Sequence, residues 1–176
     1  MRDGTPIRMS VVVPVYNGAE TLDGLVRELA ALTNPQVTTS DHSFEVSEVI
    51  LVWDRGSSGS ADAMRQLETE FNFVRTIWLS RNFGQHAATL AGMTSAEGEW
   101  VVTLDEDGQQ DPRYIGAMLD RAFATGSQLV YADPTNGAPH GGLRNAASRT
   151  TKWFFLKVLS ESSFTEFNSF RLIHGE

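Results

Sequence analysis

The sequence has no cysteine among its 176 residues. Disulfide bonds and thiolate-based metal or redox sites are therefore excluded. It also has no apolar run close to the ~18–20 residues that a membrane-spanning helix requires. The first residues, Met1–Gly4, do not begin a basic and then apolar signal peptide. Together these absences predict a protein of the cytosol.

Three motifs of well-known enzyme classes are missing as well. There is no G-x-x-x-x-G-K-[ST] segment, which excludes a P-loop enzyme. No G-x-G-x-x-G follows the first apolar run, which argues against a dinucleotide-binding Rossmann site. No G-x-S-x-G elbow is present, so nothing indicates a serine hydrolase of the α/β type.

Positive charge is scarce, with 14 Lys+Arg against 22 Asp+Glu and a net charge of −8. This balance argues against general nucleic-acid binding, which needs a basic face. The charge is uneven, because residues 1–140 have 9 basic and 19 acidic side chains, whereas residues 141–176 have 5 and 3. The basic C-terminal segment is typical of a surface for an anionic partner, although chance scatter over a soluble surface would give the same count.

Short apolar runs alternate with segments of helical periodicity, in a chain that is 41% apolar. Strands are predicted at Met9–Val15, Val46 with Val49–Trp53, Phe73–Leu79, Trp100–Leu104, Gln128–Tyr131 and Phe167–Ile173. Helices are predicted from Leu22 to about Asn34, from Ser60 to Phe71, from Gln85 to Ala96, from Asp111 to Thr125 and from Leu143 to Leu159. This order predicts one α/β domain over residues 1–176, with a mostly parallel central sheet flanked by helices.

Ligands of such sheets bind beyond the carboxyl ends of the strands. The polar side chains expected there are Tyr16 and Asn17, Asp54, Ser80–Asn82 and Asp105–Asp107. These strand ends are therefore the first place to look for a site.

An acidic tripeptide, Asp105–Asp107, follows the fourth predicted strand. Side chains alternate along an extended segment, so Asp105 and Asp107 are expected on one side and Glu106 on the other. Two close carboxylates repel each other unless a cation lies between them, and Mg²⁺ and Mn²⁺ prefer oxygen ligands. The spacing therefore fits a metal–diphosphate site. A solvated acidic turn, with Asp111 capping the next helix, is the alternative.

Four segments resemble glycosyltransferase family 2, the inverting transferases of the GT-A fold. They are VVVPVYNG (Val11–Gly18), LSRNFGQHAATLAG (Leu79–Gly92), VVTLDEDGQQDP (Val101–Pro112) and FNSFRL (Phe167–Leu172). The segments are similar to those of the polyprenyl-phosphate transferases within the family, and they occur in the family's order. The resemblance implies a GT-A nucleotide-diphospho-sugar transferase fold. It also implies transfer of a sugar from a nucleotide-diphosphate sugar to a polyprenyl phosphate, assisted by Mg²⁺ or Mn²⁺.

On the donor side, the resemblance makes Asp105 and Asp107 the D-x-D pair, with Asp107 nearest the metal. The positions that match substrate-contacting residues are Pro14, Tyr16, Asn17, Asp54, Arg81, Asn82 and Gln109. Among them, Asp54 is expected to contact the nucleotide base. Arg81 and Asn82 also lie where Asn can simply form a turn, which is the alternative to a binding role.

On the acceptor side, Arg144 and Ser148 resemble the residues that receive the lipid phosphate. Arg144 would hold this phosphate by charge-assisted hydrogen bonds and is expected to be catalytic together with Asp105 and Asp107. A phosphate monoester is already ionised near neutral pH, so no strong general base is needed. Residues 143–159 combine cations with aromatic side chains, which fits either a membrane surface or a core helix with a charged outer face.

Two departures from the family pattern keep other functions open. Trp53 stands where the family has an acidic residue, and Asp133 would repel an acceptor phosphate. They favour a family 2 transferase with a saccharide or protein acceptor, or a non-catalytic nucleotide-sugar-binding module. Many family members carry further helices after the region that matches Phe170–Leu172. We therefore expect a catalytic domain that lacks such a membrane-attachment region and acts at the cytoplasmic face of the membrane.

Overall fold

The computed structural model describes residues 5–132 and 169–175. The elements named below belong to one unit, formed by residues 1–131 with 169–176. The predicted helix Leu143–Leu159 and residues Asp133, Arg144 and Ser148 lie outside the described residues. A single domain over the whole chain stays a prediction for the same reason.

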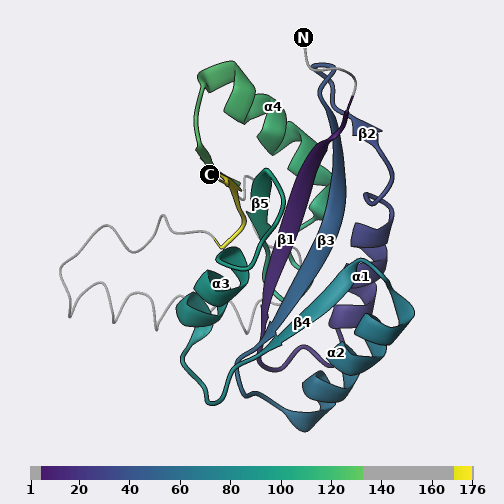
Figure 1. Ribbon diagram of the computed structural model, residues 1–176, viewed down its shortest axis with the longest axis vertical. Coiled ribbons are helices and arrows are strands. Elements are labelled where there is room, and N and C mark those ends of the chain that lie inside the picture. The colour runs from purple at the N-terminus through teal and green to yellow at the C-terminus, as the bar shows by residue number, and fades with distance from the viewer. Residues whose placement is uncertain (1–4, 133–168, 176) are drawn as a thin grey trace, which may run out of the picture. The chain divides into compact units, whose positions relative to one another are not determined.

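The central sheet has the strand order β2-β3-β1-β5-β7-β6, with β4 also pairing with β3. Its parallel strands are β1 (Ile7–Val15), β3 (Ser43–Trp53), β4 (Val74–Trp78) and β5 (Trp100–Thr103). Its antiparallel pairings involve β2 (Gln36–Val37), β6 (Leu129–Tyr131) and β7 (Arg171–His174). The long strands β1 and β3 run side by side through the middle of the sheet (Figure 1). The sheet is therefore mixed, with a parallel centre as predicted.

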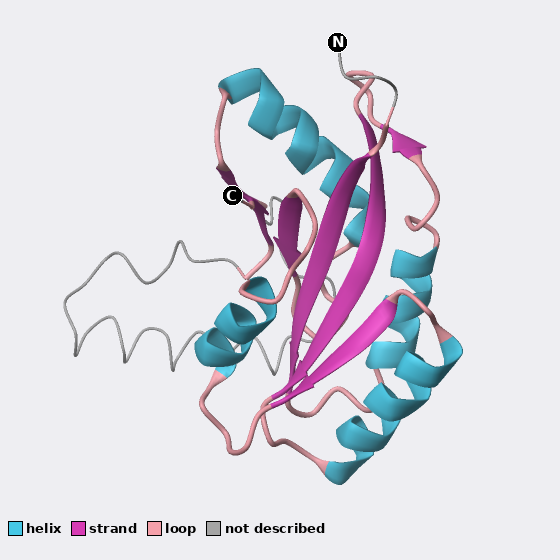
Figure 2. Ribbon diagram, viewed as in Figure 1, coloured by secondary structure: helices cyan, strands magenta, loops and turns pink. Residues whose placement is uncertain are grey.

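In the described part of the chain four α-helices accompany the sheet, and Figure 2 shows them around its strands. They are α1 (Leu22–Ala30), α2 (Ser58–Glu70), α3 (Gln85–Met93) and α4 (Ile115–Thr125), which follows the short 3-10 helix η1 (Pro112–Tyr114). Helices α1 and α2 pack on each other and contact β3, whereas α3 packs on β1 and β3. Helix α4 contacts β6 and β7.

The core is centred on β1, whose apolar run is buried almost from end to end. Val11, Val12, Val13 and Val15 have no exposed surface. Such continuous burial is typical of a parallel strand covered on both faces, because alternate side chains point to opposite sides of the sheet. Each fully buried valine contributes roughly 1.5–3 kcal/mol of hydrophobic stabilisation. The strand is therefore a firm base for the loop that follows Val15.

Two helix boundary predictions are confirmed and two are wrong. Asp111 caps η1 by accepting a hydrogen bond from the Arg113 N–H, and Gly126 ends α4 with a positive φ of 64°. Helix α2 begins at Ser58 rather than Ser60, because the Ser57 side chain accepts from the Ser60 N–H. Helix α1 ends at Ala30, before the expected stop at Asn34.

Two strand predictions also need correction. No strand was predicted between the first helix and Val46, but β2, a two-residue strand, lies there, and its Gln36 and Val37 pair with Phe44 and Ser43 of β3. From Ser169 onward, where the structure describes the chain again, the last predicted strand runs over Arg171–His174 and pairs antiparallel with β5. Pairing with another strand sets both elements: β2 pairs with the strand that follows it, and β7 pairs with strands far away in the sequence.

Candidate functional site

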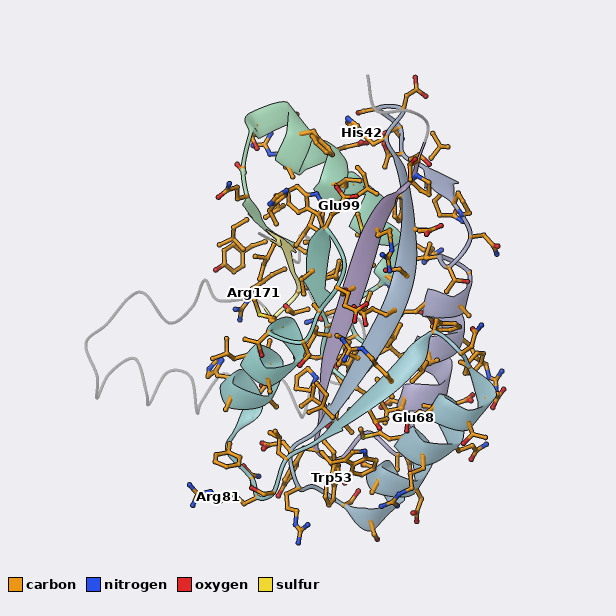
Figure 3. The ribbon with its side chains drawn as sticks, viewed as in Figure 1. His42, Trp53, Glu68, Arg81, Glu99 and Arg171 are labelled. Atoms are coloured by element: carbon orange, nitrogen blue, oxygen red, sulfur yellow. The ribbon has the colours of Figure 1, made fainter. Side chains whose placement is uncertain are left out.

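A cavity of about 460 Å³ lies at the carboxyl ends of β1, β3 and β5. It is lined by Pro14, Val15, Tyr16, Asp54, Asn82, Gly84, Gln85, Asp105, Glu106 and Asp107. Figure 3 shows Trp53 and Arg81 near this end of the sheet and His42 at the opposite end. The cavity therefore lies at the strand ends, where ligands of such sheets bind, and most of the predicted donor-side residues line it.

Asp105 is held in place by three side chains from different parts of the chain. Its Oδ1 accepts a hydrogen bond from Nε2 of Gln85 at 2.6 Å, and its Oδ2 accepts one from Nε2 of Gln110 at 3.0 Å. The Ser169 hydroxyl also donates to Oδ2. Gln110 in turn accepts from the Asp105 N–H and donates to Oγ of Ser169. Asp105 is thus a fixed, half-buried carboxylate.

Asp107 is the more open carboxylate of the pair. It is exposed, and its Oδ1 accepts a hydrogen bond from the Gln109 N–H at 3.0 Å, which closes a tight turn over Gly108. Gly108 has a φ of 66°, a conformation that glycine adopts without strain. This turn presents the Asp107 carboxylate to the cavity. Gln109 instead lines a neighbouring hollow with Glu28 and Arg113.

Glu106 does not point away from the two aspartates as the alternation rule predicts. Strand β5 ends at Thr103, and residues 106–107 lie in a turn, so the extended geometry that the rule assumes is absent. All three acidic residues line the cavity. The Glu106 carboxylate accepts hydrogen bonds from the backbone N–H groups of Tyr16 at 2.9 Å and Asn17 at 2.8 Å.

Asp54 organises the turn before α3. It is buried, and its two carboxylate oxygens accept hydrogen bonds from the N–H groups of Phe83 at 2.7 Å and Gly84 at 2.8 Å. The Asn82 side chain accepts from the same Gly84 N–H at 2.9 Å, so Asn82 has the turn-forming role given above as the alternative. A contact between Asp54 and a nucleotide base stays a prediction.

Arg81 and Trp53 lie beside the cavity without lining it. The exposed Arg81 guanidinium lies 4.7 Å from the centre of the Phe83 ring, and Figure 3 shows Arg81 pointing outward. Trp53 packs against Trp78 with ring centres 5.2 Å apart, and the Arg55 guanidinium lies 5.4 Å from its ring. Trp53, which departs from the family pattern, is therefore part of an aromatic cluster next to the cavity.

The loops after β1 and β3 touch through Gly56. The Ser57 N–H donates to the Tyr16 carbonyl at 2.9 Å. A Cβ atom on Gly56 would lie only 1.7 Å from that same carbonyl oxygen, so no other residue fits without moving the backbone. This close approach fixes Tyr16, whose side chain is about half exposed, beside Asp54.

Four residues of the site were not predicted from the sequence as functional: Gln85, Glu106, Gln110 and Ser169. Gln85 and Gln110 stand inside the motif segments, but nothing local shows that their amides reach Asp105. Ser169 lies in FNSFRL, and its contact joins two segments 64 positions apart. Arg144 and Ser148, the predicted acceptor residues, lie outside the described residues.

The carboxylate oxygens of the cavity suit a hard divalent cation as ligands. Among residues 5–132 and 169–175, no three histidine or acidic side chains come together as a metal cage. Mg²⁺ and Mn²⁺ need no such cage, because they take one or two carboxylates and complete their shell with phosphate oxygens and water. The exposed Asp107 carboxylate, with Asp105 fixed beside it, meets this requirement. In the same ranges, no helix has the length and apolar character to cross a bilayer.

Comparison with known proteins agrees with this geometry. The model of the family "Glycosyl transferase family 2" matches residues 10–173. The chain is 37% identical over 125 residues to the undecaprenyl-phosphate 4-deoxy-4-formamido-L-arabinose transferases of Salmonella choleraesuis and Salmonella typhimurium. That match covers 69% of this chain and 36% of each relative, so the chain spans about a third of their length.

Solved structures show the same architecture at lower identity. Residues 1–349 of Staphylococcus aureus TarS superpose with a TM-score of 0.59 at 16% identity, over 96% of this chain and 47% of that TarS segment. The mannosyltransferase PcManGT of Pyrobaculum calidifontis superposes with a TM-score of 0.54 at 21% identity, over 76% of this chain and 35% of PcManGT. From the family match and this likeness, the chain belongs to glycosyl transferase family 2 and has the GT-A fold.

Proposed function

We propose that this domain transfers a sugar from a nucleotide-diphosphate sugar to a polyprenyl phosphate, with inversion at the anomeric carbon. The observation that carries the proposal is the strand-end cavity, in which the Tyr16 loop and the Asp54 turn face the Asp105–Asp107 carboxylates. The relatives named for undecaprenyl-phosphate transfer support the acceptor class. PcManGT, solved with GDP-Man and Mn²⁺, supports the donor class and the cation.

Different residues of the protein would hold the nucleoside and the cation of the donor complex. The loop from Pro14 to Tyr16 and the Asp54–Gly84 turn would form the walls that hold the nucleoside. Asp107 is the exposed carboxylate that would hold Mg²⁺ or Mn²⁺, and Asp105 would stand behind it, oriented by Gln85 and Gln110. When bound, the cation would neutralise the negative charge that develops on the departing diphosphate.

The protein must position the acceptor phosphate, but it need not activate it with a strong base. A phosphate monoester is ionised near neutral pH and can attack the anomeric carbon from the face opposite the diphosphate. Arg144 and Ser148 are the positions that the family resemblance assigns to holding it, and they lie outside the described residues. Because the acceptor is carried by a lipid, the reaction would take place at a membrane surface, and we propose that this is the cytoplasmic face.

Ligand binding tests the donor half of the proposal. The melting temperature is measured with UDP-, GDP- and dTDP-sugars, each with and without MnCl₂. We expect at least one donor to raise the melting temperature, and to do so more with Mn²⁺, because a ligand that binds only the folded state stabilises it. If no donor shifts the melting temperature with or without Mn²⁺, the proposed function is wrong.

Replacing Asp107 tests the metal assignment. We expect Asp107→Asn to lower metal-dependent transfer by about 100-fold or more, since loss of one group that stabilises transition-state charge typically has this effect. Asp62→Asn is the matched control, because Asp62 is an exposed carboxylate on α2, away from the cavity, that pairs with Arg65 at 2.9 Å. Wild-type rates in Asp107→Asn would show that Asp107 does not hold the metal.

Acceptor assays separate the remaining alternatives. Transfer of labelled sugar is followed to undecaprenyl phosphate in detergent, and in parallel to soluble saccharides and to protein. The proposal expects the label in the lipid fraction. Label found only in saccharide or protein would show that the acceptor is not a polyprenyl phosphate. Donor binding without any transfer would favour a nucleotide-sugar-binding module.

A further inference from the structure

The middle residue of the acidic tripeptide makes contacts unlike those of its neighbours. The Glu106 carboxylate receives the backbone N–H groups of two consecutive residues, Tyr16 at 2.9 Å and Asn17 at 2.8 Å. Such hydrogen bonds to an ionised acceptor are stronger than those between neutral groups. One side chain from the turn after β5 thereby holds the loop after β1, which is 89 positions away.

The backbone of Glu106 holds the far end of the same loop. Its carbonyl oxygen accepts a hydrogen bond from Oγ1 of Thr21 at 2.5 Å. Thr21 is the residue before α1, and its N–H bonds back to the Gly18 carbonyl at 3.1 Å. The segment from Tyr16 to Thr21 is therefore attached to Glu106 at both ends.

Gly18 leaves the space that Glu106 occupies. A Cβ atom at position 18 would lie 2.5 Å from Oε2 of Glu106 and 3.1 Å from its Cβ. Gly18 does not have a positive φ, so the requirement here is space rather than backbone conformation. Gly18 and Glu106 thus form a matched pair across the two loops.

Charge alone argues against a carboxylate at position 106. Glu106 lines the cavity between Asp105 and Asp107, so it adds a third negative charge where an anionic diphosphate is proposed to bind. Like charges this close disfavour one another. Unless a bound cation offsets its charge, a residue that acted only through its charge would therefore weaken binding of the anionic donor.

We infer that Glu106 is a positioning residue of the donor site, which fixes the Tyr16–Gly18 loop against the turn that carries Asp107. This inference rests on the proposed function. A loop that is already ordered binds its ligand without the cost of ordering on association. Loss of Glu106 is therefore expected to weaken donor binding, although it removes a repulsive charge.

Three variants test this inference: Glu106→Gln, Glu106→Ala and the control Glu20→Gln. Glu106→Gln keeps the shape but presents an amide NH₂ to one of the two N–H groups. Glu20 is exposed and lies two residues beyond Gly18, so Glu20→Gln makes the same charge change beside the same loop. Amide hydrogen exchange of Tyr16 and Asn17 is measured in the ligand-free protein. Titration calorimetry then measures binding of UDP and GDP in MnCl₂.

We expect faster exchange at Tyr16 and Asn17 in both Glu106 variants, but not in Glu20→Gln. Affinity for the nucleotide that the wild type binds should fall about tenfold in Glu106→Ala, the usual scale for loss of a hydrogen bond to a charged group. The donor KM should rise in proportion, while kcat and the acceptor KM stay near wild type. Unchanged or tighter nucleotide binding in folded Glu106 variants would overturn the inference.

The Gly18–Glu106 pair gives a second test through a double-mutant cycle. Gly18→Ala should weaken nucleotide binding in the wild-type background, because its Cβ displaces the Glu106 carboxylate. The same change should have a smaller effect in the Glu106→Ala background, since that carboxylate is already gone. Additive effects would overturn the inference alone. A wild-type chain that binds no nucleotide would overturn the proposed function and this inference with it.

Discussion

Asp54 is the one acidic or basic side chain that is fully buried in the described ranges, with 4% of its surface exposed. Burying a carboxylate is costly unless hydrogen bonds replace its water. Here the N–H groups of Phe83 and Gly84 do so, one on each oxygen. Asp54 therefore joins the end of β3 to the turn that starts α3.

Removing one of these acceptors should weaken the protein measurably. Asp54→Asn keeps the size of the side chain but turns an NH₂ group toward one backbone N–H, leaving that donor unsatisfied. We expect a loss of about 1–3 kcal/mol in the free energy of unfolding, measured by urea denaturation. The exposed Asp62→Asn should change stability by less than about 0.5 kcal/mol. Equal stability of Asp54→Asn and wild type would contradict the structural role of Asp54.

At the scale of single residues, the sequence predicted which side chains lie at the cavity better than it predicted their hydrogen-bond partners. Asp54, Asn82, Asp105 and Asp107 all line the cavity, because each follows a strand or a short turn at one sheet edge. The partners of Asp105 could not be predicted. Gln85, Gln110 and Ser169 reach it only after the sheet has brought distant segments together.

Helix α3 depends on close contact with the sheet. Its buried residues are Ala88 and Gly92, and a Cβ atom at Gly92 would lie 2.3 Å from Cγ1 of Val12. It would also lie 3.0 Å from Cγ2 of Val52. The small residues of this helix therefore set its distance from β1 and β3, and through Gly84 and Gln85 they position one wall of the cavity.

A pair of glycine-to-alanine changes tests this packing. We expect Gly92→Ala to lower the free energy of unfolding by about 1–3 kcal/mol, because an added methyl group overpacks the core. Gly24→Ala in α1 is the matched control, since nothing lies within 4 Å of its added Cβ. It should stabilise the protein by about 0.5–1 kcal/mol through the better helix propensity of alanine. Chemical denaturation measures both, and a neutral Gly92→Ala would show that α3 can move away from the sheet.

At the scale of elements, prediction succeeded where a local pattern decides the structure. The apolar runs at β1, β3 and β5 and the stop at Gly126 are of this kind. It failed at β2, which is only two residues long and exists because β3 offers an edge. It also failed at the start of α2, where Ser57 and Ser60 both suit a cap and the fold selects Ser57.

At the scale of the whole molecule, two acidic residues away from the cavity tie the sheet to its surroundings. Burial raises the pKa of Glu48, but hydrogen bonds from Arg75, Ser10 and the Glu97 N–H outweigh it and leave the pKa below its ordinary value. Burial likewise raises the pKa of Asp120. Hydrogen bonds from Thr38, His42, Thr39 and Ser40 outweigh this effect and hold that pKa well below the usual range.

These lowered pKa values predict loss of stability in acid. A carboxyl group whose pKa is lower in the folded state binds its proton more readily in the unfolded chain. Its contribution is therefore complete above the unfolded pKa, and it is lost as the pH falls through the folded pKa. We expect the melting temperature to decline from about pH 4.5 downward, near the ordinary pKa values of Glu and Asp.

The variants Glu48→Gln and Asp120→Asn separate these two groups from general charge effects. Each should lower the melting temperature at pH 7, because a partly buried hydrogen-bond acceptor is lost. Each should also flatten the decline below about pH 4.5, since the linked proton is no longer taken up. Asp62→Asn makes the same charge change at an exposed site, so its melting temperature should fall with pH as steeply as that of the wild type. Wild-type slopes in both Glu48→Gln and Asp120→Asn would show that acid sensitivity arises elsewhere. A flatter slope in one variant alone would assign it to that carboxylate.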